Sequence, residues 1–168
     1  MAEQTIDING VPSDLGANIR GANIGPAAVR IAGLVNKISS LGWKVSDHGD
    51  IPVPVRDSLP LEVKQEKYLQ PIIDICTEVC EKTYQSVSSG GIPLLIGGDH
   101  SVVVGSISGV CKHYKKHQQE VGLIWVDAHA DLNTPKSSES GNIHGMPLAT
   151  VLGDGHPALT NIGYEGQK

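Results

Sequence analysis

The sequence predicts an α/β fold in which a parallel β-sheet lies between two layers of helices. Short apolar runs of strand length alternate along the chain with longer segments whose apolar residues recur every three or four positions. Glycine and proline residues separate the two kinds of segment. Because strand–helix–strand units build parallel sheets that are covered on both faces, this alternation indicates a three-layer α/β/α architecture.

The first part of the chain contains two predicted strands, over residues 4–11 and 44–51. A helix is predicted over residues 25–41, because a proline is tolerated in its first turn and apolar residues follow at helical spacing. Gly42 is expected to end that helix. The three prolines of segment 52–60 predict an extended loop rather than a further helix or strand.

The second part of the chain repeats the pattern. A long helix is predicted over residues 61–88, and the two glycines at 90–91 stop it. Residues 92–96 form a short apolar run that predicts a buried strand. A helix over residues 101–114 and a further strand over residues 120–126 complete the alternation, so that four parallel strands are expected.

Composition limits the kinds of partner that the protein can have. The 168 residues match the length of one domain, and a hydrophobic content of 39% is sufficient for a buried core. The net charge of −5 argues against nucleic acid or an anionic membrane as a partner and suits a cation-binding protein. No apolar run reaches the length of a membrane span, and no signal or transit pattern opens the chain, so we expect a cytoplasmic protein.

Polar residues that can bind metal directly follow the strand predicted over 120–126. Asp127, His129 and Asp131 occupy alternate positions, separated by alanines. In an extended chain the two aspartates would lie roughly 13 Å apart, too far to share one ion. In a helix the aspartates would be neighbours, but the histidine would point to the opposite side. If all three bind metal, the segment must therefore be an irregular turn.

A second such residue, His100, follows the strand predicted over 92–96. Right-handed crossovers place the carboxyl ends of parallel strands at one edge of the sheet, so His100 and Asp127 are expected to converge. Together with His129 and Asp131 they supply two imidazoles and two carboxylates. This mixed set suits manganese, leaves zinc and iron open, and suits calcium less well.

Several segments resemble the motifs of the arginase family of ureohydrolases in order and spacing. The clearest are residues 97–101 (GGDHS), 126–131 (VDAHAD) and 140–147 (SGNIHGMP). Residues 21–33 and 50–51 are similar to the opening segment of that family. The similarity covers nearly the whole chain, and it implies an arginase-like α/β fold.

The resemblance implies a site that holds two Mn²⁺ ions when it is complete. His100, Asp127 and Asp131 would bind one ion, and Asp127 would bridge to a second ion that His129 also binds. Two cations lower the pKa of a water enough to supply the hydroxide that attacks a guanidinium carbon. His144 is the implied proton shuttle to the leaving amine, and Asp131 is grouped with it among the catalytic residues. From residue type alone, His144 could instead cap the short helix that follows Pro147.

The same resemblance implies hydrolysis of L-arginine to L-ornithine and urea. Asn133, Ser140 and Asn142 match positions that bind the α-carboxylate of the substrate, although these residue types are also common turn formers. Agmatine has no such carboxylate, so the loop favours arginase activity over that of an agmatinase, which stays open as an alternative.

The resemblance is to the N-terminal part of the family fold. A later Asp-x-Asp motif and a later glutamate of the family have no counterpart in this sequence. We therefore expect a single arginase-like domain over residues 1–168, truncated before the second half of the fold and inactive when isolated. In the family, strands from that second half separate the two strands that present His100 and Asp127. The full-length form is expected to be a homo-oligomer, and the alternative is a non-catalytic truncated isoform that associates with full-length subunits.

Overall fold

The protein contains a parallel β-sheet of three strands in the order β2-β1-β3. β1 (Thr5–Val11) is central, and it pairs in parallel with β2 (Lys44–Asp50) on one side and β3 (Ile92–Gly97) on the other. These three strands confirm the predictions for the corresponding segments. The computed structural model describes residues 4–65, 67–166 and 168.

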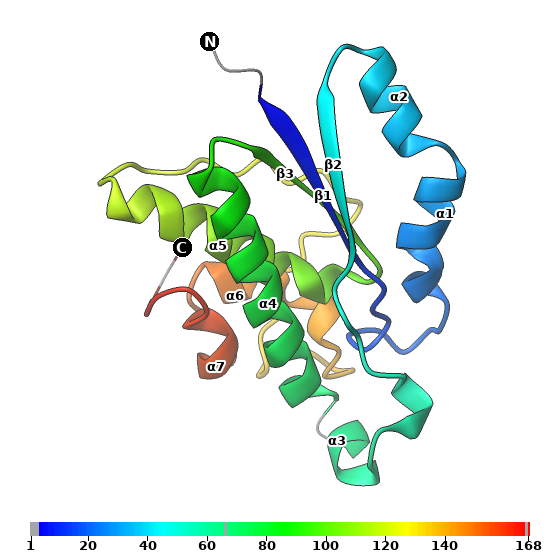
Figure 1. The fold of residues 1–168 in the computed structure, drawn as a ribbon. Helices are drawn as coiled ribbons and strands as arrows, with labels where there is room; N and C mark the ends of the chain where they lie inside the picture. Colours follow the sequence, from blue (N-terminus) through cyan, green and yellow to red (C-terminus); the bar gives the residue numbers. More distant parts are fainter. Residues whose placement is uncertain (1–3, 66, 167) are drawn as a thin grey trace.

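Helices cover both faces of this sheet (Figure 1). α1 (Gly25–Ile31) and α2 (Leu34–Ser40) connect β1 to β2 and lie on one face. α3 (Leu61–Gln65) and α4 (Leu69–Ser88) connect β2 to β3, and α4 covers the other face together with α5 (Val103–Lys116). The connection from β1 to β2 and the connection from β2 to β3 run across the sheet in opposite directions, and right-handed crossovers of opposite direction place their helices on opposite faces. The predicted three-layer α/β/α fold is confirmed.

Short helices complete the layer formed by α4 and α5. α6 (Pro147–Val151) packs against α5, and α7 (Pro157–Thr160) packs against both α4 and α6. No helix in the described part of the chain has the length and apolar character needed to cross a bilayer. Single turns of 3-10 helix occur at Ala22–Ile24, Arg56–Ser58, His100–Val102 and Ile143–Gly145.

Two of the predicted helices are each divided in the structure. The helix predicted over 25–41 is two helices, because Gly33 adopts a left-handed conformation with φ 83°. The helix predicted over 61–88 is divided between α3 and α4, where Lys67 and Tyr68 have φ values of 52° and 59°. A left-handed residue cannot continue a right-handed helix, so the chain changes direction at each point. Residue 66, inside the second prediction, lies outside the described residues.

The prediction of a strand over residues 120–126 is wrong. The segment forms no ladder with any described strand, and Ile124 and Val126 are 90% and 92% exposed. A cavity of about 500 Å³, lined by Leu95 of β3 and by Leu123, lies between the sheet and this segment. The apolar run has the composition of a strand, but its position leaves it without a neighbour to pair with.

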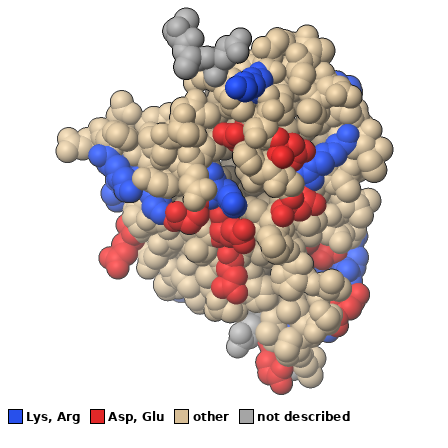
Figure 2. Space-filling view, in the orientation of Figure 1, with Lys and Arg blue, Asp and Glu red and all other residues tan. Residues whose placement is uncertain are grey.

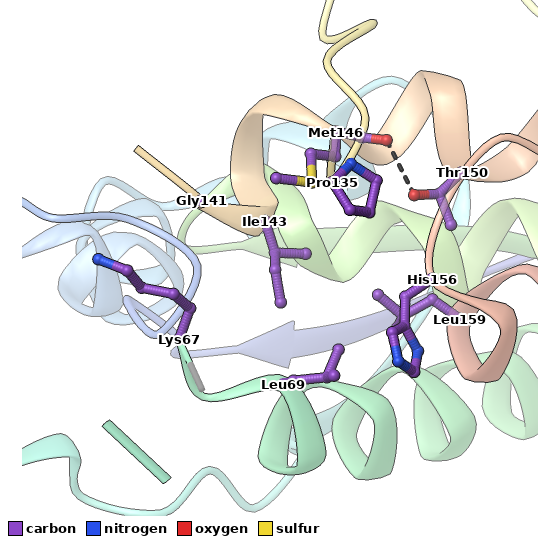
Figure 3. Close-up of a pocket in the computed structure, with 9 residues that line it drawn as sticks. All are labelled: Lys67, Leu69, Pro135, Gly141, Ile143, Met146, Thr150, His156 and Leu159. Carbon is purple, nitrogen blue, oxygen red and sulfur yellow. Dashed lines mark hydrogen bonds between the residues drawn. The ribbon is translucent and has the colours of Figure 1, made fainter. Parts of the chain in front are cut away.

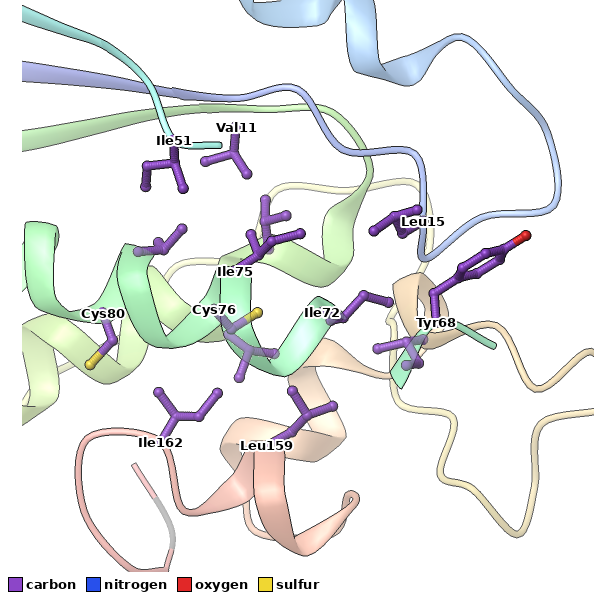
Figure 4. Packing of buried hydrophobic residues seen from close by; sticks show 14 of the residues in the cluster. Val11, Leu15, Ile51, Tyr68, Ile72, Ile75, Cys76, Cys80, Leu159 and Ile162 are labelled. Atoms are coloured by element: carbon purple, nitrogen blue, oxygen red, sulfur yellow. The ribbon is translucent and has the colours of Figure 1, made fainter. Parts of the chain in front are cut away.

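The main hydrophobic core lies between the sheet and α4 (Figure 4). Buried side chains recur along α4 at helical spacing, and they meet Val11 and Ile51 on the sheet side. Leu159 and Ile162 cover the opposite side of the helix. Two of the buried residues, Cys76 and Cys80, are free thiols in a packing face. The core face of α4 comprises Ile72, Ile75, Cys76, Val79 and Cys80.

Charged side chains on the surface are mixed in sign. On the face shown in Figure 2, lysine and arginine side chains alternate with aspartate and glutamate. One ion pair on the protein surface joins Lys112 of α5 to Glu81 of α4. Another group centres on Arg30 of α1, which donates from Nε and Nη2 to both carboxylate oxygens of Asp47 at 2.8 and 2.9 Å. Arg30 also donates to Asp50, so it ties α1 to the end of β2.

Replacing Arg30 with methionine is expected to lower the free energy of unfolding by about 1 kcal/mol at pH 7, because two carboxylates lose a charge-assisted donor. The hydrogen bonds from Arg30 lower the pKa of Asp47 in the folded state. A depressed carboxyl pKa contributes stability above the unfolded pKa of about 3.9, and this contribution is lost as the pH falls through the folded pKa. The difference between the two proteins should therefore shrink below about pH 4, which urea unfolding at pH 7, 5 and 3 measures.

The matched control for this experiment is Lys37→Met. Lys37 is exposed on α2 and makes no ion pair with the described residues. Its replacement should leave the unfolding free energy within about 0.5 kcal/mol of the original at every pH. A stability loss in Arg30→Met that stayed the same at pH 3 and pH 7 would contradict the role given to the ion pair.

Candidate metal centre

His100 stands at the carboxyl end of β3. The strand ends at Gly97, and the 3-10 helix His100–Val102 follows. The backbone N–H of Ser101 donates to Oδ1 of Asp99 at 2.9 Å, so that Asp99 caps this turn. The fold therefore presents the imidazole of His100 at the edge of the sheet, where the crossover argument places it.

Asp99 also fixes the end of β3 to the loop that follows β1. It is 6% exposed, and its Oδ2 accepts hydrogen bonds from the backbone N–H of Gly16 at 2.9 Å and from the hydroxyl of Ser13 at 3.4 Å. Its own N–H donates to the carbonyl oxygen of Ser13 at 2.9 Å. A Cβ at Gly98 would lie 1.9 Å from that same oxygen. Only glycine allows this approach, so the motif residues before His100 have a positioning role.

The chain between Asp127 and Asp131 forms the irregular turn that the spacing predicts. It bends at Ala128 and His129, and Asp131 has a left-handed φ of 49°, a conformation that aspartate tolerates. The backbone N–H of His129 donates to Oδ1 of Asp127 at 2.8 Å. This hydrogen bond is the main cause that lowers the pKa of Asp127. The turn brings the carboxylates of Asp127 and Asp131 to the same side of the chain.

Three of the four candidate metal ligands converge. Nδ1 of His100 lies 2.9 Å from Oδ2 of Asp127 and 2.8 Å from Oδ2 of Asp131. One potential ligand atom from each of the three residues lies within 4.8 Å of the others. His129 stands apart from this group, since its Nδ1 is 3.6 Å from Oδ1 of Asp127 and its side chain is 85% exposed.

These residues line a cleft of about 530 Å³ at the sheet edge. The cleft gathers every candidate site residue that the sequence analysis singles out, from three separate segments of the chain. No lysine or arginine is among its lining residues. The candidate residues in the lining are His100, Asp127, His129, Asp131, Asn133, Ser140, Asn142 and His144.

The donor set of the cleft fits a divalent cation. One imidazole nitrogen and two carboxylate oxygens already face each other, and mixed nitrogen and oxygen ligands suit Mn²⁺. In the structure, Nδ1 of His100 is within hydrogen-bond distance of Asp127 and Asp131. A metal ligand must give up its proton, so a cation would take the place of the proton at this nitrogen.

His144 is held in the cleft by its backbone. Its N–H donates to the carbonyl oxygen of Gly16 at 3.2 Å, and the carbonyl oxygen of Gly145 accepts from the N–H of Asn133 at 3.1 Å. The alternative role for His144, as a side-chain cap of α6, is wrong, because the N-cap residue of α6 is Met146 and no side chain caps it. Gly16 thus connects Asp99 on one side with His144 on the other.

The three candidate substrate-binding residues make hydrogen bonds within their own loop. The hydroxyl of Ser140 accepts from the N–H of Asn142 at 3.2 Å, and Oδ1 of Asn133 accepts from the hydroxyl of Ser137 at 3.3 Å. Asn142 is buried, whereas Asn133 and Ser140 are exposed. Their positions in the cleft agree with a binding role, and their local bonds are those of turn-forming residues.

Sequence reasoning did not find two residues that position His100. One is Asp99, for which the sequence carries a usable signal, since an aspartate just before a helical turn is a common cap. Trp125 belongs to an apolar run, yet its ring lies edge-on to the imidazole of His100 with the centroids 5.5 Å apart. No pattern in the sequence indicates that contact.

The structure combines a parallel α/β fold with an imidazole and two carboxylates that face each other beside the carboxyl end of β3, and these features define an α/β protein with a candidate divalent-metal centre. Comparison with known proteins identifies the family within this class. Residues 4–167 match the Arginase family, and the chain belongs to that family.

The similar proteins include bacterial arginases. An arginase from Brevibacillus brevis is 44% identical over 160 residues, which are 95% of this chain and 52% of that protein. The crystal structure of the arginase from Bacillus caldovelox matches with a TM-score of 0.86 at 43% identity, over 95% of this chain and 52% of that one. The structure of the arginase from Bacillus cereus gives a TM-score of 0.85 at 40% identity, over 97% of this chain and 52% of that one. The chain thus spans about half the length of these relatives.

Agmatinases are more distant. The agmatine ureohydrolase of Thermoplasma volcanium matches with a TM-score of 0.58 at 26% identity, over 88% of this chain and 45% of that one. A putative agmatinase from Clostridium difficile is 22% identical with a TM-score of 0.58 and shares the fold alone. Both similarity measures therefore place the chain nearer to the arginases.

Proposed function

We propose that this chain carries part of an arginase active site, which hydrolyses L-arginine to L-ornithine and urea with the help of two Mn²⁺ ions. One observation carries the proposal. Candidate residues from three separate segments line a single cleft, and three of them face each other at distances that a shared cation requires. The arginases similar to this chain support the choice of reaction.

His100, Asp127 and Asp131 would hold the first ion. Asp127 would also contribute to a second ion with His129, whose Nδ1 lies 3.6 Å from Oδ1 of Asp127. When bound, the two ions lower the pKa of a water so that hydroxide is available at neutral pH. Asp131, whose Oδ2 lies 2.8 Å from Nδ1 of His100, would keep the imidazole oriented and would also act at the reacting centre.

His144 would transfer a proton to the leaving amine. Its backbone is anchored at Gly16 while its side chain lines the cleft, so the imidazole can move without displacing the loop. Asn133, Ser140 and Asn142 offer neutral hydrogen-bond donors, which can orient the substrate α-carboxylate without adding charge to the metal site. This feature favours L-arginine over agmatine, which carries no carboxylate.

The 168-residue chain on its own should bind Mn²⁺ weakly and turn over L-arginine slowly. Only three potential ligands converge among the described residues, and the side chain of His100 is 51% exposed. Loss of supporting groups around a metal commonly reduces affinity or activity 10- to 100-fold, so we expect urea release at least about 100-fold below that of a full-length arginase. An assay of the purified chain with added Mn²⁺, beside a Bacillus arginase, measures this. Turnover equal to the reference would contradict the predicted inactivity, and absence of Mn²⁺ binding would contradict the metal site.

A second candidate function is non-catalytic association with a full-length subunit of the same family. It is favoured by the outer edge of β3, which pairs with no other described strand, and by the exposed apolar side chains of Ile124 and Val126. Exposed strand edges and apolar runs promote pairing with another chain. Co-expression with a tagged full-length arginase should co-purify this chain, and the double substitution of Ile124 and Val126 by lysine should abolish the association. Failure of the unmodified chain to co-purify removes this candidate.

A further inference from the structure

Four of the seven histidines do not line the metal cleft. Two of the four have partners within the fold. Nε2 of His48 lies 3.0 Å from Oδ1 of Asp7. His156, which lies beside the apolar cavity shown in Figure 3, caps the first turn of α7 with its Nδ1. The other two, His113 and His117, stand together at the end of α5.

α5 carries this histidine pair away from the metal cleft. The helix begins directly after the turn that holds His100, and it runs back along the sheet (Figure 1). His113 follows His100 by 13 positions, which at the helical rise of 1.5 Å per residue is a separation of roughly 20 Å. An ion bound by the pair therefore shares no ligand with the metal cleft.

The two imidazoles are spaced for chelation of one ion. They occupy positions i and i+4 of the helix, with ring centroids 4.7 Å apart and planes inclined by 48°. A metal lies about 2.0–2.1 Å from an imidazole nitrogen, so two imidazoles on one ion have centroids roughly 4.5–5.3 Å apart for bond angles between 90° and 109°. His117 is exposed, so its ring can turn toward a shared ion without disturbing the core.

Ser88, the last residue of α4, orients the first imidazole. Its Oγ lies 3.0 Å from Nδ1 of His113, so Nε2 is the nitrogen left for an ion. Histidines that bind metal commonly donate their other ring N–H to an oxygen, which fixes the tautomer and the ring orientation. The contact with Ser88 supplies that arrangement from a neighbouring helix.

The surrounding charges decide which ions can bind. Lys112 and Lys116 hold their ammonium groups 4.7 and 4.6 Å from the ring centroid of Tyr84. Lys115 lies over Tyr164 at 3.8 Å. The carbonyl end of α5 attracts cations, but the lysines repel them, so only an ion with a strong preference for imidazole overcomes the repulsion. Ni²⁺, Cu²⁺ and Zn²⁺ have this preference, whereas Mg²⁺ and Ca²⁺ prefer oxygen ligands.

We propose that His113 and His117 form a second metal site, which binds one transition-metal dication of the Ni²⁺, Cu²⁺ and Zn²⁺ group. Each histidine contributes one ring nitrogen, and water completes the coordination. Because chelation needs the helical spacing, the ion holds the last turn of α5 and, through Ser88, its contact with α4. The site is independent of the arginase reaction.

The proposal is tested by titrating the 168-residue chain with Zn²⁺ and following the histidine ring nitrogens by ¹H–¹⁵N NMR, which resolves this site from the cleft. We expect the Nε2 signal of His113 and one ring nitrogen of His117 to shift saturably at the same Zn²⁺ concentration. Mg²⁺ should shift neither. Absence of the Zn²⁺ shifts, shifts of the two residues at different Zn²⁺ concentrations, or an equal response to Mg²⁺ would overturn the proposal.

Variants separate the spacing from the number of histidines. His117→Gln should weaken Zn²⁺ binding at His113 at least about tenfold, because a single imidazole cannot chelate. The double variant His117→Gln/Gln118→His keeps seven histidines but moves one imidazole to i+5, and it should bind as weakly as His117→Gln. His48→Gln, which removes an exposed histidine outside the pair, should leave affinity at His113 within about twofold. Binding by the double variant that is as tight as that of the unmodified chain would contradict a site defined by helical spacing.

Discussion

Replacing Asp131 with asparagine is expected to weaken Mn²⁺ binding by this chain about 100-fold. The substitution removes one of the two carboxylates that face Nδ1 of His100, and an amide oxygen is a far poorer ligand for a hard cation. Asparagine has nearly the same shape and tolerates the left-handed φ of 49° at this position. The fold should therefore be retained. Electron paramagnetic resonance of free Mn²⁺ during a titration measures the affinity.

The matched control is Asp154→Asn. Asp154 is exposed and does not line the cleft, so the same loss of charge there should leave Mn²⁺ affinity within about twofold. If both variants bound Mn²⁺ as tightly as the unmodified chain, Asp131 would not be a ligand. If both weakened binding equally, the effect would be one of net charge rather than of coordination.

Replacing Gly98 with alanine should lower the free energy of unfolding by about 3 kcal/mol. The added Cβ would lie 1.9 Å from the carbonyl oxygen of Ser13, and the backbone must move to relieve that overlap. The movement separates Asp99 from the loop after β1, where the backbone N–H of Gly16 donates to its carboxylate. A buried carboxylate that loses a hydrogen bond adds to the cost. Urea unfolding at pH 7 gives the stability, and the Mn²⁺ titration should show weaker binding because His100 moves with the turn.

Gly122→Ala serves as the control for backbone effects of the same substitution. No heavy atom lies within 4 Å of a Cβ at Gly122, and the residue is exposed. Its replacement should change stability by no more than about 0.5 kcal/mol. A similarly small effect of Gly98→Ala would mean that the end of β3 can shift freely, and the positioning role given to the motif glycine would then be wrong.

The strands and their direction could be predicted because apolar runs and alternating helices constrain a parallel sheet strongly. The failure at residues 120–126 has a physical reason. The hydrophobic pattern shows that a segment is apolar enough to be a buried strand, but a strand also needs a neighbouring strand whose backbone can pair with it. The two helix breaks also differ in how far the residue types predict them. Gly33 gave a visible signal, but nothing in the residue types of Lys67 and Tyr68 indicates a left-handed backbone.

The convergence of the candidate ligands could also be predicted. The rule that parallel strands end at one edge holds for His100, which follows β3, but it reached Asp127 through a strand over 120–126 that the structure does not contain. The spacing of Asp127 and Asp131 correctly required a turn rather than a strand. The network around Asp99 could not be predicted, because its carboxylate bonds Gly16 at a separation of 83 positions. Contacts of that kind depend on how two loops meet after the sheet has formed.

The packing of α4 gives the protein an internal reporter of unfolding. The thiol of Cys76 is fully buried in the core, and this desolvation raises its pKa to about 12. Alkylating reagents attack the thiolate and must also reach the sulfur, so Cys76 is protected on both counts while the helix stays in place. The rate at which iodoacetamide labels Cys76 therefore measures how often α4 separates from the sheet.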